Sequence, residues 1–139
     1  MKKGITCLLV LAILFSMNVF VFAAEEEPIC EDELIEEYVS VIQISTVLTK
    51  SASTAICKVN VRRKIELDSV YGSFNLVDSN GKTVASDNRY LQKSGANFVY
   101  THGFNMPKSG TYKVKCTLKT YKNGALQETI NCITNSVQK

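Results

Sequence analysis

The sequence contains one histidine, and this residue limits the acid–base chemistry open to the chain. His102 alternates with Tyr100 and Phe104, which places the three side chains on one face of a strand. We expect this face to be core, where a neutral histidine is ordinary. Asp78 and Asp87 could pair for acid–base work, but both lie among Ser, Asn and Gly, which is typical of turns. No phosphate loop, H-E-x-x-H or G-x-S-x-G motif occurs, so we expect no enzyme and no cofactor.

The cysteines offer a second kind of chemistry. Cys7 falls inside the apolar stretch that begins the chain and would be removed with it. Four cysteines then remain, an even number that predicts two disulfides outside the reducing cytosol: Cys30, Cys57, Cys116 and Cys132. Zinc is the alternative, but no two of these residues have the spacing of a zinc site. We therefore expect no metal.

Contacts to a ligand could come from basic and aromatic side chains. Arg62, Arg63 and Lys64 form the densest basic cluster and are a possible anion contact, with Arg62 and Lys64 on one face of a strand. Tyr90 and Tyr121 are expected to point outward, each near a Lys or Arg. A solubilising strand end accounts for the basic cluster equally well.

The chain begins with the pattern of an export signal. Two lysines precede an apolar stretch, and small residues suit cleavage after Ala23. We expect residues 1–23 to be a signal peptide, 24–38 an acidic arm or short helix, and 39–139 one domain. An uncleaved membrane anchor is the alternative. Cleavage would give a secreted protein, with no stable membrane insertion, that could remain associated with the cell wall.

Charge is divided along the chain. Residues 24–37 hold eight acidic side chains, whereas residues 38–139 hold five acidic and 14 basic ones, a net charge of +9. Such a body would attract polyanions. Three alternatives remain open: the acidic arm favours export, the arm folds back on the body, or the lysines are the solvated faces of strands.

Apolar residues recur at every second position from Val39 onward, which predicts strands. Alternation of this kind runs through 42–48, 57–67, 74–84, 98–106 and 112–132. Tight turns are predicted at 78–81 (Asp-Ser-Asn-Gly) and at Asn123-Gly124. Ile42, Ile44 and Leu48 are expected to face inward, and Leu126 to share a side with Ile130 and Cys132. Seven or eight strands without a long helical pattern predict an all-β, antiparallel β-sandwich.

Two segments resemble immunoglobulin-like domains. Ser109-Gly110-Thr111-Tyr112, followed by Val114 and Cys116, is similar to the start of strand F, and Cys57 with Val59 and Val61 is similar to strand B. The resemblance implies an immunoglobulin-like sandwich whose sheets are joined by Cys57–Cys116, with Cys30–Cys132 as the second bridge. The other connectivities remain open, Cys116–Cys132 foremost among them.

The layout also resembles small secreted proteins of unknown function from clostridia and related Gram-positive bacteria. These share a signal, an acidic start, an early Cys-bearing strand, and a late Tyr-x-Val strand followed by an Asn-Gly hairpin. The resemblance implies a cell-surface or secreted binding or structural module. The partner would be an anionic cell-surface polymer or an extracellular protein, and no nucleic acid is expected. The alternative is an exported effector, an inhibitor or toxin-like protein, that acts on a competitor or host.

Overall fold

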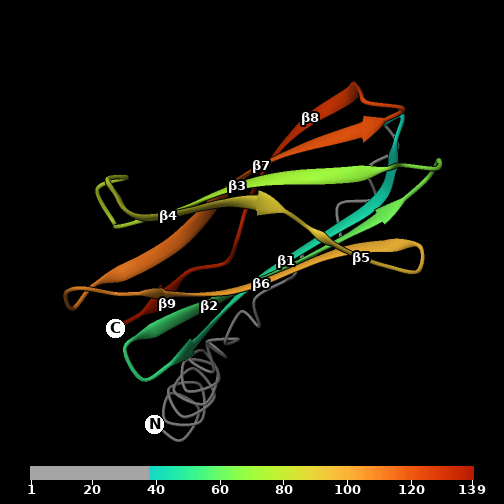
Figure 1. The fold of residues 1–139 in the computed structure, drawn as a ribbon. Coiled ribbons are helices and arrows are strands. Elements are labelled where there is room, and N and C mark those ends of the chain that lie inside the picture. The colour runs from blue at the N-terminus through green and yellow to red at the C-terminus, as the bar shows by residue number, and fades with distance from the viewer. Residues whose placement is uncertain (1–37) are drawn as a thin grey trace, which may run out of the picture.

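The computed structural model describes residues 38–139, which form two antiparallel β-sheets packed face to face (Figure 1). The predicted signal peptide 1–23, all of the predicted acidic arm except Tyr38, and Cys30 lie outside the described residues. No helix in residues 38–139 is long and apolar enough to cross a membrane.

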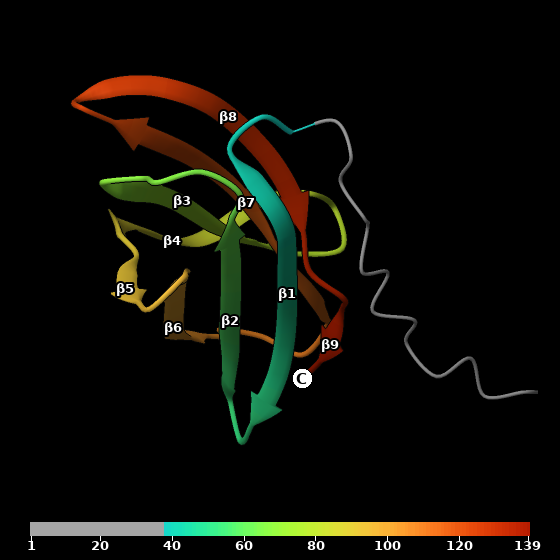
Figure 2. The ribbon, with the colours of Figure 1, turned by 90° about the vertical axis from the view of Figure 1, so that its right-hand side faces the viewer.

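The strand order is that of an immunoglobulin-like sandwich. Sheet A contains, in spatial order, β1 (Val41–Ser51), β2 (Thr54–Arg63), β6 (Asn97–Asn105) and β5 (Gln92–Ser94). Sheet B contains β4 (Thr83–Tyr90), β3 (Ser69–Val77), β7 (Thr111–Lys122) and β8 (Ala125–Ile133), and β9 (Val137–Gln138) pairs with β7. Figure 2 shows the two layers from the side. The predicted antiparallel sandwich is confirmed; the two shortest strands, β5 and β9, had no clear period-two signal.

Both predicted turns are present. Asn123 and Gly124 have positive φ angles of 52° and 74°, as the two central residues of a type I′ hairpin require. At the β3–β4 turn, Oδ1 of Asp78 accepts hydrogen bonds from the backbone N–H groups of Asn80 (2.9 Å) and Lys82 (3.0 Å). Asp78 therefore serves the turn, as the sequence predicts.

Tyr112 fixes the entry to β7. Its hydroxyl donates to the carbonyl oxygen of Lys108 at 2.9 Å and accepts from the Lys108 N–H at 3.3 Å. A tyrosine that bonds back to the preceding backbone is characteristic of strand F in immunoglobulin-like domains. Here it precedes the strand's cysteine by four residues, two more than is usual.

The centre of the sandwich is aromatic. Phe74 of β3 and Tyr100 of β6 stack across the two sheets, with ring centroids 3.6 Å apart and planes 10° apart. The Phe74 ring folds back over Gly72, where a Cβ atom would overlap it and also press on Leu91. Gly72 thus makes room for the contact that joins the sheets.

Three expectations about strands were wrong. A bulge between Val41 and Gln43 turns Ile42 outward, so this side chain is 42% exposed while Val41 is buried. A second bulge at Thr120/Tyr121 places Leu126 opposite Tyr121 on the outer face, 53% exposed. The second strand also ends at Arg63 instead of running on to residue 67, because the chain turns there toward sheet B.

Candidate functional site

Each of the five acidic side chains of residues 38–139 makes a contact within the protein. The exposed faces of the sheets are therefore left with basic side chains as their charged groups. Asp78 holds the β3–β4 turn. Glu66 pairs with Arg63 three residues earlier in the chain. Asp68 accepts from the backbone N–H of Gly124 at 3.4 Å. The remaining two, Asp87 and Glu128, lie where the edges of the two sheets meet.

Glu128 fastens β8 to the start of β1, along what we call the β1–β8 seam. Its carboxylate accepts hydrogen bonds from the backbone N–H groups of Val39 (2.6 Å) and Ser40 (3.0 Å) and from the Ser40 hydroxyl. Ser40 is fully buried and also bonds Thr120. Burial raises the pKa of Glu128, but these hydrogen bonds and the charge of Lys64 outweigh it, so the pKa lies below its ordinary value.

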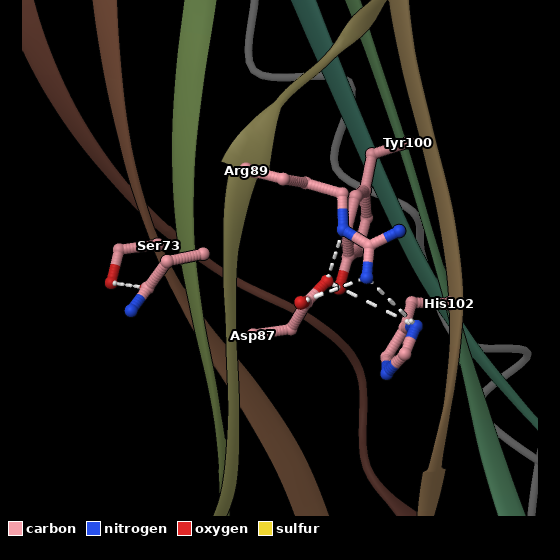
Figure 3. Close-up of polar contacts among 6 residues, drawn as sticks. Ser73, Asp87, Arg89, Tyr100 and His102 are labelled. Carbon is pink, nitrogen blue, oxygen red and sulfur yellow. Dashed lines mark hydrogen bonds and ion pairs between the residues drawn. The ribbon is translucent and has the colours of Figure 1, made fainter.

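Asp87 occupies the opposite edge, the β4–β6 seam. Two of its contacts are to Arg89: Nε of Arg89 lies 2.6 Å from Oδ2, and a terminal guanidinium nitrogen lies 2.8 Å from Oδ1. The Tyr100 hydroxyl donates to Oδ2 at 3.0 Å, and Nδ1 of His102 lies 3.9 Å from it. Figure 3 shows the four side chains converging, with Ser73 apart from them.

The contacts of Asp87 set its protonation. Burial acts to raise its pKa, but the hydrogen bonds from Arg89 and Tyr100 and the charges of His102 and Arg89 hold it below the ordinary value. Burial and the bond to Asp87 raise the pKa of the Tyr100 hydroxyl. A carboxylate held ionised in this way is a weak base. What the group provides is an ion pair within β4 and a hydrogen bond from Tyr100 that crosses from sheet A to sheet B.

His102 departs from the expected core position. Its side chain is 35% exposed, although Tyr100 and Phe104 on either side of it are buried. Asp87 departs as well, because it lies within β4 and not in a turn. No sequence pattern signals the Asp87 cluster, since two of its members come from β4 and two from β6, and the meeting of these strands depends on how the sheets are stacked.

The predicted basic cluster is divided by the structure. Arg62 is exposed on the outer face of sheet A. Arg63 is paired with Glu66, and its side chain is only 17% exposed. Lys64 follows the end of β2, and its charge acts on Glu128 across the β1–β8 seam. Of the three, Arg62 alone is placed to meet a large ligand on the face of a sheet.

Arg62 borders an open polar hollow of about 580 Å³. Uncharged residues from β1 and β2 and from the start of β6 complete it: Gln43, Ser45, Asn60, Ala96 and Asn97. The strands of sheet A contain no acidic residue. This hollow can accept an anion, but it offers only one cation to hold it.

A longer array of cations lies on sheet B. Lys113, Lys115 and Lys119 alternate along β7 with buried side chains and therefore point away from the core, as predicted. Tyr90 and Tyr121 also point outward, as predicted, and Tyr90 is 62% exposed. These residues make the outer face of sheet B the richest candidate binding surface among the described residues.

Three cysteines meet inside the sandwich. Cys57 of β2 and Cys116 of β7 are buried, and Cys132 lies directly opposite Cys116 on β8. Hydrogen bonds to Cys132 and Cys57, together with burial, raise the pKa of the Cys116 thiol far above its ordinary value. Cys116 thus lies within reach of both partners that the sequence suggested for it. No group of three or more His, Cys, Asp or Glu side chains in 38–139 is arranged to hold a metal ion.

No family model and no curated protein matches the chain. Matches exist among solved structures. The Br derivative of BhCBM56 has a TM-score of 0.40 and 10% identity, over 69% of this chain and 89% of that chain. A Ruminococcus gnavus beta-glucuronidase has a TM-score of 0.41 and 13% identity, over 67% of this chain and 15% of that chain. A Bacteroides fragilis chain described as a beta-galactosidase has a TM-score of 0.40 and 16% identity, over 65% of this chain and 15% of that chain. This chain thus covers about 15% of the length of the last two proteins. The similarity is one of chain fold and assigns neither an activity nor a ligand.

Proposed function

We propose that this chain is an exported, non-enzymatic β-sandwich protein whose cationic body binds an anionic polymer at a cell surface. One observation carries the proposal: all five carboxylates of residues 38–139 are engaged in turns, local pairs or seams, while lysines stand exposed on the sheet faces. Residues 38–139 carry a net charge of +9, and their ion pairs involve arginines, so the lysines on the sheet faces remain available to a polyanion. The export pattern of residues 1–23 would place this charge where wall polymers occur.

Placement distinguishes this charge from that of an ordinary solvated surface. On a surface of mixed charge, a lysine on one strand can be neutralised by an acidic residue opposite it on the next strand. Here the strands of sheet A carry no acidic residue, and the two acidic residues on the strands of sheet B, Asp87 and Glu128, are drawn into the seams. A polyanion approaching either face meets no carboxylate that belongs to an outward-facing strand position.

Co-sedimentation with purified Gram-positive cell walls tests the proposal. The protein without its signal, residues 24–139, is mixed with walls that carry or lack their anionic polymers, across a salt titration. We expect binding that requires the anionic polymers and that weakens as salt rises, because exposed charges are screened within about 10 Å at 0.1 M salt. Absence of binding at low salt would contradict the proposal and leave the charge division to export or to neutralisation by the acidic arm.

A further inference from the structure

The outer face of sheet B combines aromatic, hydroxyl, amide and lysine side chains in register. One rung across the sheet runs from Tyr90 through Tyr71 and Lys119 to Thr129. The next outward-facing rung contains Asn88, Ser73, Thr117 and Asn131, and the one after it contains Ser86, Asn75, Lys115 and Ile133. Aromatic, hydroxyl, amide and ammonium groups thus share a single face, and no carboxylate occupies any of these positions.

Hydrogen bonds within the rungs leave donors for a ligand. The Ser73 hydroxyl bonds Oδ1 of Asn88 (2.6 Å), Ser86 bonds Oδ1 of Asn75 (2.7 Å), and Thr117 bonds Oδ1 of Asn131 (2.9 Å). Each bond uses the acceptor oxygen of an amide and leaves its NH₂ group to donate elsewhere. These amide NH₂ groups and the lysine ammonium groups favour ligands that are rich in acceptor oxygens.

The lysines follow a line. Lys113 and Lys119 are six residues apart on β7, which corresponds to about 20 Å along a strand. Lys113 and Lys115 also border an open hollow of about 570 Å³ beside the β3–β4 turn. Asp78 lines the same hollow, but its Oδ1 already accepts two backbone hydrogen bonds. A linear chain with repeated negative charges complements this arrangement better than a single compact anion.

The tyrosines add a surface for rings. Tyr71 and Tyr90 pack edge to face, with centroids 5.1 Å apart and planes 72° apart, and Tyr90 is 62% exposed. Amphipathic rings with exposed faces are typical of binding surfaces for partners that have both apolar and polar sides, as sugar rings have. Lys119 lies directly opposite Tyr71. Tyr71 can therefore contact a sugar ring while Lys119 contacts the acidic group of the neighbouring sugar.

From these features we propose that the outer face of sheet B is a binding site for a linear anionic glycan, and that it is the main polymer-binding face of the protein. This inference rests on the proposed function and gives it a location and a ligand class. Single-stranded nucleic acid fits less well, because the face has no arginine and, of its three tyrosines, only Tyr71 and Tyr90 pack together, whereas nucleic-acid grooves stack successive bases. The donor-rich amides suit the oxygens of sugars and their acidic groups.

Matched double variants locate the site. Lys115→Gln with Lys119→Gln changes sheet B, and Lys58→Gln with Arg62→Gln removes the same charge from the outer face of sheet A. Binding of residues 24–139 is measured with polygalacturonate and with polymer-bearing walls. We expect the sheet B pair to lose about tenfold in affinity and the sheet A pair less than about threefold, given the usual strength of exposed charge contacts. All four residues are exposed, so both proteins should unfold at the wild-type temperature.

The outcomes separate this inference from the proposed function. Equal losses of affinity in the two double variants would overturn the sheet B site, while the proposal that the protein binds an anionic polymer would stand. Failure of the wild-type protein to bind either polymer would overturn both. Tighter binding of an oligothymidylate than of polygalacturonate would overturn the glycan assignment in favour of nucleic acid.

Tyr90→Ser tests whether the aromatic ring of Tyr90 contributes to binding. Polygalacturonate and polyglutamate both carry carboxylates, but only the first has sugar rings. We expect Tyr90→Ser to weaken binding of polygalacturonate about fivefold, the usual range of an aromatic contact, and to leave binding of polyglutamate unchanged. Equal weakening for both polymers would overturn the ring contact.

Discussion

The two open sides of the sandwich are closed by different chemistry. At the β1–β8 seam, side chains of one sheet bond to the backbone of the other: Glu128 holds Val39 and Ser40, while Asn135 donates to the carbonyl oxygen of Leu48 and accepts from its N–H. At the β4–β6 seam, side chains bond only to side chains, with Asp87 linked to Arg89 and Tyr100. The first seam fixes the position of a strand. The second pairs two charges within β4 and joins β4 to β6 through the Tyr100 hydroxyl.

Burial makes the two seams unequal in strength. Ser40 is fully buried, so loss of its carboxylate partner would leave its backbone N–H without an acceptor, although its hydroxyl would keep its bond to Thr120. The Arg89 side chain is 49% exposed and that of His102 is 35% exposed, so water can replace their contacts with Asp87. We therefore expect the β1–β8 seam to contribute more to stability than the β4–β6 seam, although the latter holds more charged groups.

The largest effect should come from the cysteines between the seams. We expect peptide mapping without reduction to link Cys57 to Cys116, because their thiols meet across the sheets. Reduction should lower the free energy of unfolding by about 2–4 kcal/mol, measured by urea titration. The reduced protein would then show how well the two seams hold the sheets without a covalent bond.

Two mapping results would contradict this prediction. Unmodified thiols at Cys57 and Cys116 in the native exported protein would leave only the seams and the core to join the sheets. A peptide that links Cys116 to Cys132 would place the bond within sheet B, where the two residues lie directly opposite each other. In that case the bond would not join the sheets, and the β1–β8 seam would carry more of the stability.

Glu128→Ala should have the next largest effect. It removes an acceptor that serves two backbone N–H groups and the buried Ser40 hydroxyl, so we expect a loss of about 2–3 kcal/mol in the free energy of unfolding. Glu66→Ala is the control, because its partner Arg63 is local and the Glu66 side chain is 75% exposed. The control should lose less than about 1 kcal/mol. Similar losses in the two variants would show that the β1–β8 seam is no stronger than a surface ion pair.

Sequence patterns predicted the layers better than the seams. Period-two alternation placed Cys57, Cys116 and the lysines of β7 on their observed faces, because burial of one face fixes a strand's register. Alternation failed at Ile42 and Leu126, where a bulge reverses the faces without a change in composition. A bulge depends on the partner strand, which a single segment does not reveal.

The candidate surface was only partly foreseen. Tyr90, Tyr121 and the lysines of β7 were expected to point outward, but Tyr71 was not singled out. Its position between the inward-facing Val70 and Gly72 carries the signal that would have found it. The contacts of Asp87 with Tyr100 and His102 depend on how the two sheets stack. No pattern within one segment of the sequence indicates this stacking.

The smallest effect should come from Asp87. Asp87→Asn weakens the links to Arg89 and Tyr100, and we expect a loss of about 1 kcal/mol at neutral pH because half of the Arg89 side chain is exposed. Urea titration against wild type measures this loss. A loss as large as that of Glu128→Ala would contradict the ranking of the seams.

The pH dependence of stability gives a second way to distinguish the two seams. Asp87 and Glu128 have folded-state pKa values below the ordinary values of 3.8 and 4.5, so each contributes stability above its ordinary pKa that is lost as the pH falls through the folded value. Wild type should therefore lose stability below about pH 4.5, the ordinary value for Glu128. Asp87→Asn should flatten this loss mainly below about pH 4, and Tyr100→Phe should flatten it less, because Arg89 still holds the carboxylate. A slope in Asp87→Asn equal to that of wild type would mean that the β4–β6 seam does not depend on the ionised carboxylate.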